Sequence, residues 1–89
     1  MKDFRGAVAA ITGAGSGMGR ALALALAERG CHLALADVDE PGLAETLGLV
    51  AESVGNQNLT VSRHLVDVAD REAVERFAAE AAAAHGKVN

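Results

Sequence analysis

A glycine-rich segment runs from Thr12 to Gly19 with the sequence Thr-Gly-Ala-Gly-Ser-Gly-Met-Gly. It separates a short apolar run from a stretch of strong helix formers, which predicts a loop that opens a helix. The start of a helix exposes unpaired N–H groups and carries about half a positive charge, so it binds phosphate. Gly13, Gly17 and Gly19 are spaced for a tight turn, a close approach to a pyrophosphate and close helix packing, in that order.

Two better-known phosphate-binding patterns do not fit this loop. The dinucleotide pattern Gly-x-Gly-x-x-Gly needs a glycine at position 18 or 20, which are Met18 and Arg20. A P-loop would continue with Gly-Lys-Ser/Thr, which is absent. The remaining pattern is Thr-Gly-x-x-x-Gly-x-Gly. It can be interpreted as a phosphate-binding loop or, alternatively, as a flexible turn before a helix.

Two aspartates follow later apolar runs in comparable positions. Asp37 ends the second run, eighteen residues after Gly19, and Asp67 follows the third run. An acid at the first place can accept hydrogen bonds from the hydroxyls of an adenosine ribose. Either aspartate alone could be a solvated loop residue or a helix cap. A glycine loop and two acids at the carboxyl ends of successive strands together indicate a nucleotide site.

Predicted strands and helices alternate along the chain. Short apolar or alternating runs predict strands at 7–12, 32–37 and 59–65. Helices are expected at 18–29, from about Pro41 to Val54, and after Asp70. Strands that alternate with helices predict an α/β fold whose parallel sheet is covered on both faces.

Caps and helical faces support these boundaries. Gly30, Gly55 and Gly86 stand where the three helices should end, and Asp70 is suited to be an N-cap. One apolar face is predicted for the second helix and one for the third, with Val88 and Asn89 opening a further element. These faces consist of Leu43, Leu47, Val50 and Val54, and of Val74, Phe77, Ala78 and Ala81.

Thr12–Gly19, Asp37 and Asp67-Val68 together resemble the N-terminal part of a short-chain dehydrogenase/reductase, over about Arg5 to Asn89. The resemblance implies a three-stranded βαβαβα portion of a doubly wound Rossmann fold. It also implies that residues 1–89 are a single, partial dinucleotide-binding domain that ends before the fourth strand.

The resemblance carries cofactor contacts onto particular residues. In the family the glycine loop binds the pyrophosphate, and Met18 stands where isoleucine is usual. Asp37 would bind the adenosine ribose, with Val38 beside the adenine. Asp67 would accept from the adenine amino group, with help from the Val68 amide. The loop residues that correspond are Gly13, Ser16, Gly17, Met18 and Gly19.

The catalytic motifs of the family are absent from the chain. They are an Asn-Asn-Ala-Gly segment, a serine and a Tyr-x-x-x-Lys, but the chain has no tyrosine and its only lysines are Lys2 and Lys87. We therefore expect the dinucleotide-binding portion of an enzyme that moves hydride between a nicotinamide and an alcohol or carbonyl substrate, without turnover by itself. The alternatives are a stand-alone nucleotide-binding or regulatory module, and a remnant or interaction domain without a ligand.

The preferred cofactor should be NAD rather than NADP. The 2′-phosphate of NADP would face the Asp37 carboxylate, and two unit charges about 4 Å apart repel by about 1 kcal/mol in water and about 4 kcal/mol at an effective dielectric near 20. The family's NADP-binding members usually offset this with basic residues at the positions of Ser16 and Val38, which are neutral here. Arg20 and Arg63 remain candidates to offset the repulsion between the 2′-phosphate and Asp37.

Composition limits the remaining functions. A net charge of -4 argues against nucleic acid, and the longest apolar run, Ala21 to Ala27, is too short to cross a bilayer. A single cysteine suits a reducing cytoplasm. The resemblance also implies a homo-oligomeric parent enzyme. No metal site is expected, because Cys31 and His32 point to opposite faces of a strand and His64 and His85 have no partner at a metal-binding spacing.

Overall fold

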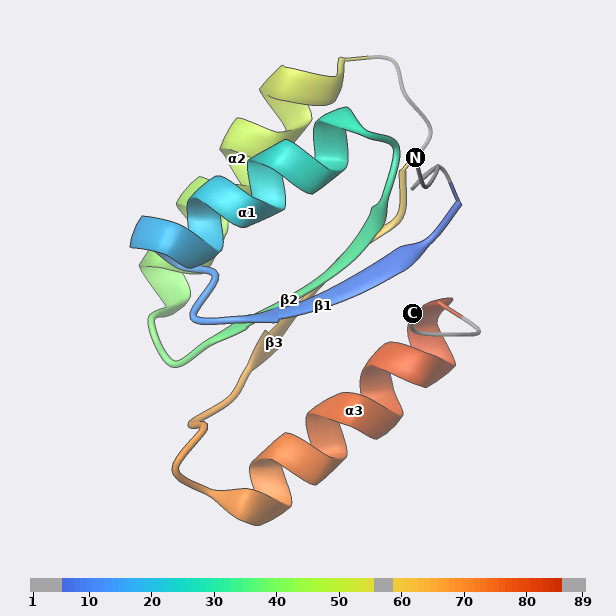
Figure 1. The fold of residues 1–89 in the computed structure, drawn as a ribbon. Helices are drawn as coiled ribbons and strands as arrows, with labels where there is room; N and C mark the ends of the chain where they lie inside the picture. Colours follow the sequence, from blue (N-terminus) through green and yellow to red (C-terminus); the bar gives the residue numbers. More distant parts are fainter. Residues whose placement is uncertain (1–5, 56–58, 86–89) are drawn as a thin grey trace.

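The computed structural model describes residues 6–55 and 59–85. Three strands alternate with three helices in this part of the chain (Figure 1). Their bounds are β1 (Val8–Thr12), α1 (Gly17–Glu28), β2 (His32–Asp37), α2 (Glu40–Val54), β3 (Val61–Leu65) and α3 (Arg71–His85).

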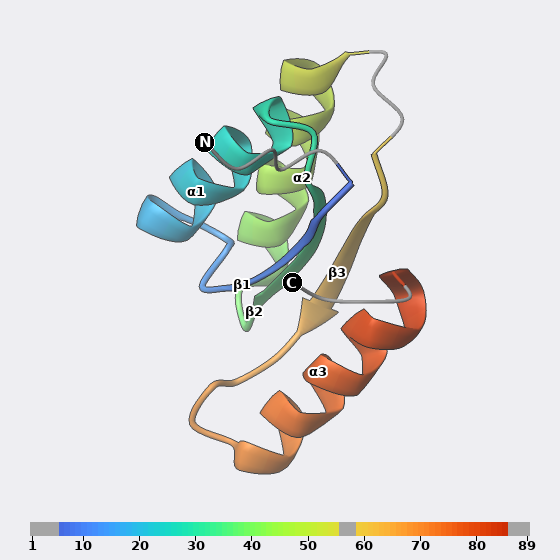
Figure 2. The same ribbon diagram turned by 45° about the vertical axis from the view of Figure 1, so that its right-hand side comes forward.

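The strands form one parallel sheet in the order β1-β2-β3. Helices α1 and α2 cover one face and α3 covers the other (Figure 2). The predicted α/β fold with a sheet covered on both faces is therefore confirmed. Because β2 is the central strand, it faces a helical layer on each side.

Side-chain size along β2 differs between the two faces. Leu33 and Leu35 pack toward α1 and α2, whereas Ala34 and Ala36 pack toward α3, and all four are fully buried. A strand buried on both faces reads as a continuous apolar run, which is the pattern that predicted it. The small alanines leave room for the ring of Phe77, the largest buried side chain of α3.

The expected caps are present at the described helix ends. Asp39 accepts from the Gly42 N–H at the start of α2 (3.1 Å), and Asp70 accepts from the Glu72 N–H at the start of α3 (3.1 Å). Gly30 follows α1 with φ 87°, and Gly55 follows α2 with φ 58°. Both values lie in the left-handed region, where glycine is favoured.

The bounds of the elements differ from the prediction by at most two residues, and one member of a predicted helical face is exposed. The third strand starts at Val61 rather than at residue 59, because the Thr60 N–H donates to Nδ1 of His32 (2.9 Å) instead of to a backbone carbonyl. Ala78 is exposed, since only a narrow stripe of α3, with Phe77 and Ala81 buried, lies on the sheet. The cap expected at Gly86 and the element expected at 88–89 lie outside the described residues. None of the described helices is long and apolar enough to cross a membrane.

Candidate nucleotide-binding site

The carboxyl ends of the three strands meet at one edge of the sheet. Thr12 pairs with Ala36, and Asp37 pairs with Leu65, so the strands end almost level with one another. The segments 13–16, 38–39 and 66–70 follow these ends and lie on the same side of the molecule (Figure 1). Ligands of open parallel sheets bind at this edge.

The three glycines of the first segment divide into two kinds. Gly13 and Gly17 have φ values of 64° and 56°, and a Cβ at either position would meet no atom within 4 Å. Gly19 has no such free space, because a Cβ there would overlap the Gly13 carbonyl. The first two glycines therefore allow a turn beside open space, and the third allows α1 to pack against the loop.

The open space lies at the start of α1. Ser16 precedes the helix in an extended conformation (φ -169°), and its side chain makes no capping hydrogen bond. The first N–H groups of a helix have no intrahelical partner, so those of α1 are available to an anion. The Met18 side chain is 90% exposed, which leaves its backbone as its contribution to the loop.

Asp37 is held beside this loop by backbone donors. Its Oδ2 accepts from the Gly15 N–H (2.8 Å), and its Oδ1 accepts from the N–H groups of Val38 (2.7 Å) and Asp39 (3.2 Å). The Gly15 N–H is the main cause that holds the pKa of the Asp37 carboxyl below its usual 3.8, although partial burial acts against it. Asp37 is therefore a carboxylate at neutral pH. A carboxylate has about four acceptor positions, so one remains for a further donor.

The third segment carries the other predicted residues. Asp67 is exposed, and its Oδ1 accepts from the Ala69 N–H (2.9 Å). The Val66 N–H donates to the Asp37 carbonyl (3.1 Å), which fixes this segment next to the end of β2. Val38 and Val68 are 64% and 62% exposed. Two neighbouring loops thus present apolar side chains and a carboxylate to solvent.

Arg20 has a different role from the one left open by the sequence. Its Nη2 donates to the carbonyls of Gly15 (2.6 Å) and Gly42 (3.2 Å), and its Nε donates to Oγ1 of Thr46 (2.9 Å). Its Nη1 pairs with Glu45 (2.6 Å). These contacts occupy the guanidinium on the α2 side of the loop. Sequence reasoning missed Gly42 and Thr46, although a glycine in the first turn of a helix and a threonine on an apolar helix face were visible signals.

Two histidines that lie far apart in the sequence form a second cluster on the α3 face. Oγ of Ser62 lies 2.9 Å from Nε2 of His64 and 2.8 Å from Nε2 of His85. Nδ1 of His64 lies 3.1 Å from Glu80. No group of three or more His, Cys, Asp or Glu side chains within residues 6–55 and 59–85 could hold a metal ion. Because both imidazoles cover the Ser62 hydroxyl, this cluster joins β3 to α3.

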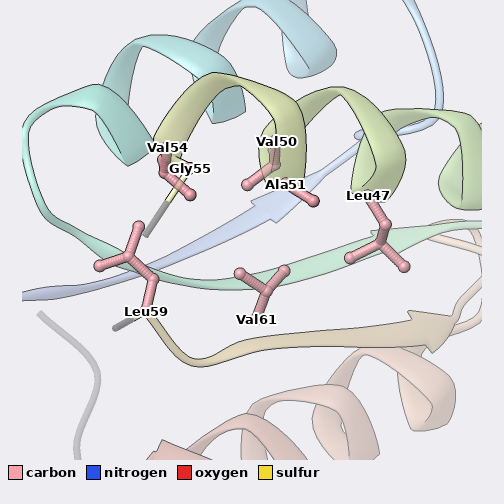
Figure 3. A pocket seen from close by; sticks show the side chains of 7 residues that line it. All are labelled: Leu47, Val50, Ala51, Val54, Gly55, Leu59 and Val61. Atoms are coloured by element: carbon pink, nitrogen blue, oxygen red, sulfur yellow. The ribbon is translucent and has the colours of Figure 1, made fainter. Parts of the chain in front are cut away.

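A cavity of about 290 Å³ lies between the last turns of α2 and the start of β3 (Figure 3). This position is at the opposite end of the sheet from the glycine loop. Its lining side chains are all hydrocarbon, so none of them could transfer a proton or bind an ion. The lining residues are Leu47, Val50, Ala51, Val54, Gly55, Leu59 and Val61.

Comparison with known proteins identifies the family. The sequence profile of the short chain dehydrogenases matches residues 7–89. The chain belongs to this family. The protein named oxidoreductase SadH from Mycobacterium tuberculosis is 52% identical over 89 residues, which are 100% of this chain and 31% of SadH.

Solved structures of short-chain dehydrogenases have the same fold. One from Burkholderia phymatum in complex with NAD is 43% identical, with a TM-score of 0.88. The match covers 100% of this chain and 30% of the Burkholderia chain. One from Mycobacterium paratuberculosis bound to NAD is 27% identical with a TM-score of 0.86, and covers 99% and 36%. The chain thus spans about a third of the length of these relatives. It is the N-terminal, nucleotide-binding portion of a short-chain dehydrogenase fold, in a family that binds nicotinamide dinucleotides.

Proposed function

We propose that this chain is the NAD-binding portion of an oxidoreductase that moves hydride between a nicotinamide and an alcohol or carbonyl substrate. The observation that carries the proposal is the Asp37 carboxylate, which is fixed by the Gly15 amide at the edge of an open glycine loop. The loop leaves space above Gly13 and Gly17, as a bound pyrophosphate would require.

The described residues fit the parts of a dinucleotide in order. The N-terminus of α1 would hold the pyrophosphate, with backbone contributions from Ser16, Met18 and Gly19. Asp37 would accept from the adenosine ribose. The exposed side chain of Val38 would lie beside the adenine, and Asp67 with the Val68 amide would bind its amino group. We assign these roles to residues 1–89 as one partial domain.

The electrostatics of the site favour NAD. A 2′-phosphate would meet the Asp37 carboxylate, and the guanidinium of Arg20 is already bound to two carbonyls, a hydroxyl and Glu45. Arg63 is on the neighbouring strand β3, where it pairs with Leu35 and not with Asp37. Asp37 pairs with Leu65, two residues further along both strands. With no cation free beside Asp37 on α1 or β2, a repulsion of about 1–4 kcal/mol is expected for NADP.

The nicotinamide, when bound, supplies or accepts the hydride. Proton transfer to or from the substrate oxygen needs a positioned acid or base, and this chain has no tyrosine to serve as one. We therefore place the proton-transfer residues, the substrate site and any subunit contacts in other parts of a longer protein. The absence of tyrosine also keeps a non-catalytic NAD-binding module as the second candidate. The single thiol, Cys31, is buried and suits a cytoplasmic setting.

Calorimetric titration with NAD and NADP tests the proposal. The wild-type chain should bind NAD more tightly, by about fivefold or more. Asp37→Ala combined with Val38→Arg should reverse the preference, because it removes the carboxylate and adds a cation. Glu52→Ala, at an exposed position near the far end of α2, is the control and should bind both as the wild type does. Tighter binding of NADP by the wild-type chain would contradict the cofactor assignment. NADH production with an alcohol by this chain would exclude the non-catalytic module, and it would also contradict the placement of the proton-transfer residues elsewhere.

A further inference from the structure

Every backbone polar group of Ala14 and Gly15 has a partner. The Ala14 N–H donates to the Ala36 carbonyl (3.0 Å), and the Gly15 N–H donates to Oδ2 of Asp37 (2.8 Å). The Ala14 carbonyl accepts from Oγ1 of Thr46 (2.7 Å), and the Gly15 carbonyl accepts from Nη2 of Arg20 (2.6 Å). The two amides are therefore bound to β2, and the two carbonyls are bound to side chains of α1 and α2.

Thr46 is the centre of the carbonyl side of this arrangement. It is fully buried, and it is the one polar residue in the buried core of the described chain. Its hydroxyl donates to Ala14 and accepts from Nε of Arg20 (2.9 Å), so both of its hydrogen-bonding functions are used. A buried hydroxyl with both functions satisfied defines the position of its partners closely.

Gly42 allows α2 to come close enough for these contacts. A Cβ at Gly42 would lie 2.5 Å from the Gly15 carbonyl oxygen and 2.5 Å from Oδ2 of Asp39. The Gly42 carbonyl also accepts from Arg20 (3.2 Å). Glycine is therefore required here by contact with backbone, since its own φ is ordinary.

The direction of the two carbonyls matters for an anion. Carbonyl oxygens carry partial negative charge and would repel a phosphate if they turned toward the open side of the loop. Bonded to Thr46 and Arg20, they point to α2, so that the unpaired N–H groups at the start of α1 are what the open side presents to an anion. Gly15 also links the two halves of the site, because its carbonyl is bound by Arg20 and its amide by Asp37.

We propose that Arg20, Thr46 and Gly42 form a latch that positions the glycine loop and the Asp37 carboxylate for NAD without touching the cofactor. This role rests on the proposed dinucleotide site. The latch residues are positioning residues, and they act through the carbonyls of Ala14 and Gly15. Arginine is required because lysine lacks the planar fork that binds Gly15, Gly42 and Thr46 at once.

Four variants and one control test the latch by NAD titration. Arg20→Lys and Thr46→Val should each weaken NAD binding by about tenfold or more. Thr46→Val leaves the Ala14 carbonyl without its donor, and a lysine at position 20 cannot bind Gly15, Gly42 and Thr46 at once. Thr46→Ser keeps the hydroxyl and should bind NAD nearly as the wild type does. Gly42→Ala should weaken binding by pushing α2 away from the loop. Arg76→Gln is the control, since Arg76 is an exposed arginine in the middle of α3, which packs on the opposite face of the sheet from α1 and α2.

A second measurement separates positioning from general stability. The pKa of the Asp37 carboxyl, followed by NMR, should rise toward its usual value in Arg20→Lys, because the Gly15 amide is then held less firmly. If Thr46→Val fails to fold, Arg20→Lys and the comparison of Thr46→Ser with the wild type carry the test. Failure of the wild-type chain to bind NAD would refute the proposed function. Wild-type binding that Arg20→Lys leaves unchanged, with the Asp37 pKa also unchanged, would overturn the latch alone.

Discussion

Substitutions at different glycines of the loop should have different effects, some on stability and some on binding. A side chain at Gly19 would collide with the Gly13 carbonyl, so its loss should destabilise the fold. A side chain at Gly17 would meet no protein atom, but it would fill the space above the start of α1. The same loop therefore contains a packing glycine and a binding glycine, which experiments can distinguish.

Gly17→Val is the substitution that isolates the binding role. We expect it to abolish NAD binding, because the valine side chain would occupy the pyrophosphate space. Its φ of 56° adds a folding cost of about 1–2 kcal/mol, since a residue with a Cβ is strained in the left-handed region. Titration with NAD and a thermal melt of the same sample measure the two effects separately.

Gly48→Ala is the matched control for this variant. Gly48 lies inside α2, and a Cβ there would also meet no atom within 4 Å. Because alanine is the better helix former, the change should raise stability by up to about 1 kcal/mol and leave NAD binding intact. NAD binding by Gly17→Val at wild-type strength would show that the space above Gly17 is not used.

At the scale of elements, α3 is joined to β3 by one chain of polar side chains. If Glu80 accepts from Nδ1 of His64, then Nε2 of His64 accepts from the Ser62 hydroxyl, which in turn accepts from Nε2 of His85. Nδ1 of His85 is then an unprotonated, buried nitrogen without a hydrogen-bond partner among the described residues. A second proton on His85 would put a charge on a buried ring, and a backbone hydrogen bond with Leu33 offsets only part of that cost.

Acid should therefore weaken the docking of α3. Burial lowers the pKa of His85 below its usual 6.5, and the charges of His32 on β2 and His64 on β3 act in the same direction. The unfolded chain takes up the proton first, so this contribution to stability is complete above about pH 6.5 and is lost as the pH falls through the lower, folded pKa. Urea unfolding at pH 7.5 and pH 5.5 should show the loss, and His85→Asn should reduce the difference. An equal pH dependence in both proteins would contradict the role of His85.

The sequence predicts features that depend on neighbouring residues, but it does not predict contacts between residues far apart along the chain. Periodicity and caps act within a few residues, so the sequence alone was sufficient to locate β2, the glycine ends of α1 and α2 and the Asp70 cap. The latch joins Arg20 to Thr46, and the polar cluster joins Ser62 to His85, across gaps of more than twenty residues. Such contacts exist only after α2 and α3 have docked on the sheet, so spacing along the chain does not reveal them.

At the scale of the whole molecule, the two outer strands of the described sheet differ in what protects them. β3 carries Arg63, and charged side chains on an edge strand discourage pairing with another chain. β1, with the sequence Val-Ala-Ala-Ile-Thr, carries no charge and pairs only with β2 within the described residues. Its other edge leaves N–H and C=O groups that can pair with a further strand.

The 89-residue chain by itself should therefore self-associate through β1. Light scattering should show species larger than the monomer, and amides of Val8–Thr12 should exchange faster in dilute samples than in concentrated ones. Ala10→Lys should reduce the association, because Ala10 is exposed on this strand and a lysine on an edge opposes pairing. Ala25→Lys adds the same charge on the exposed side of α1 and should leave the association unchanged, which separates the edge effect from net charge. A sharp monomer peak with strongly protected amides along β1 would show instead that the three-stranded sheet is stable with its edge open.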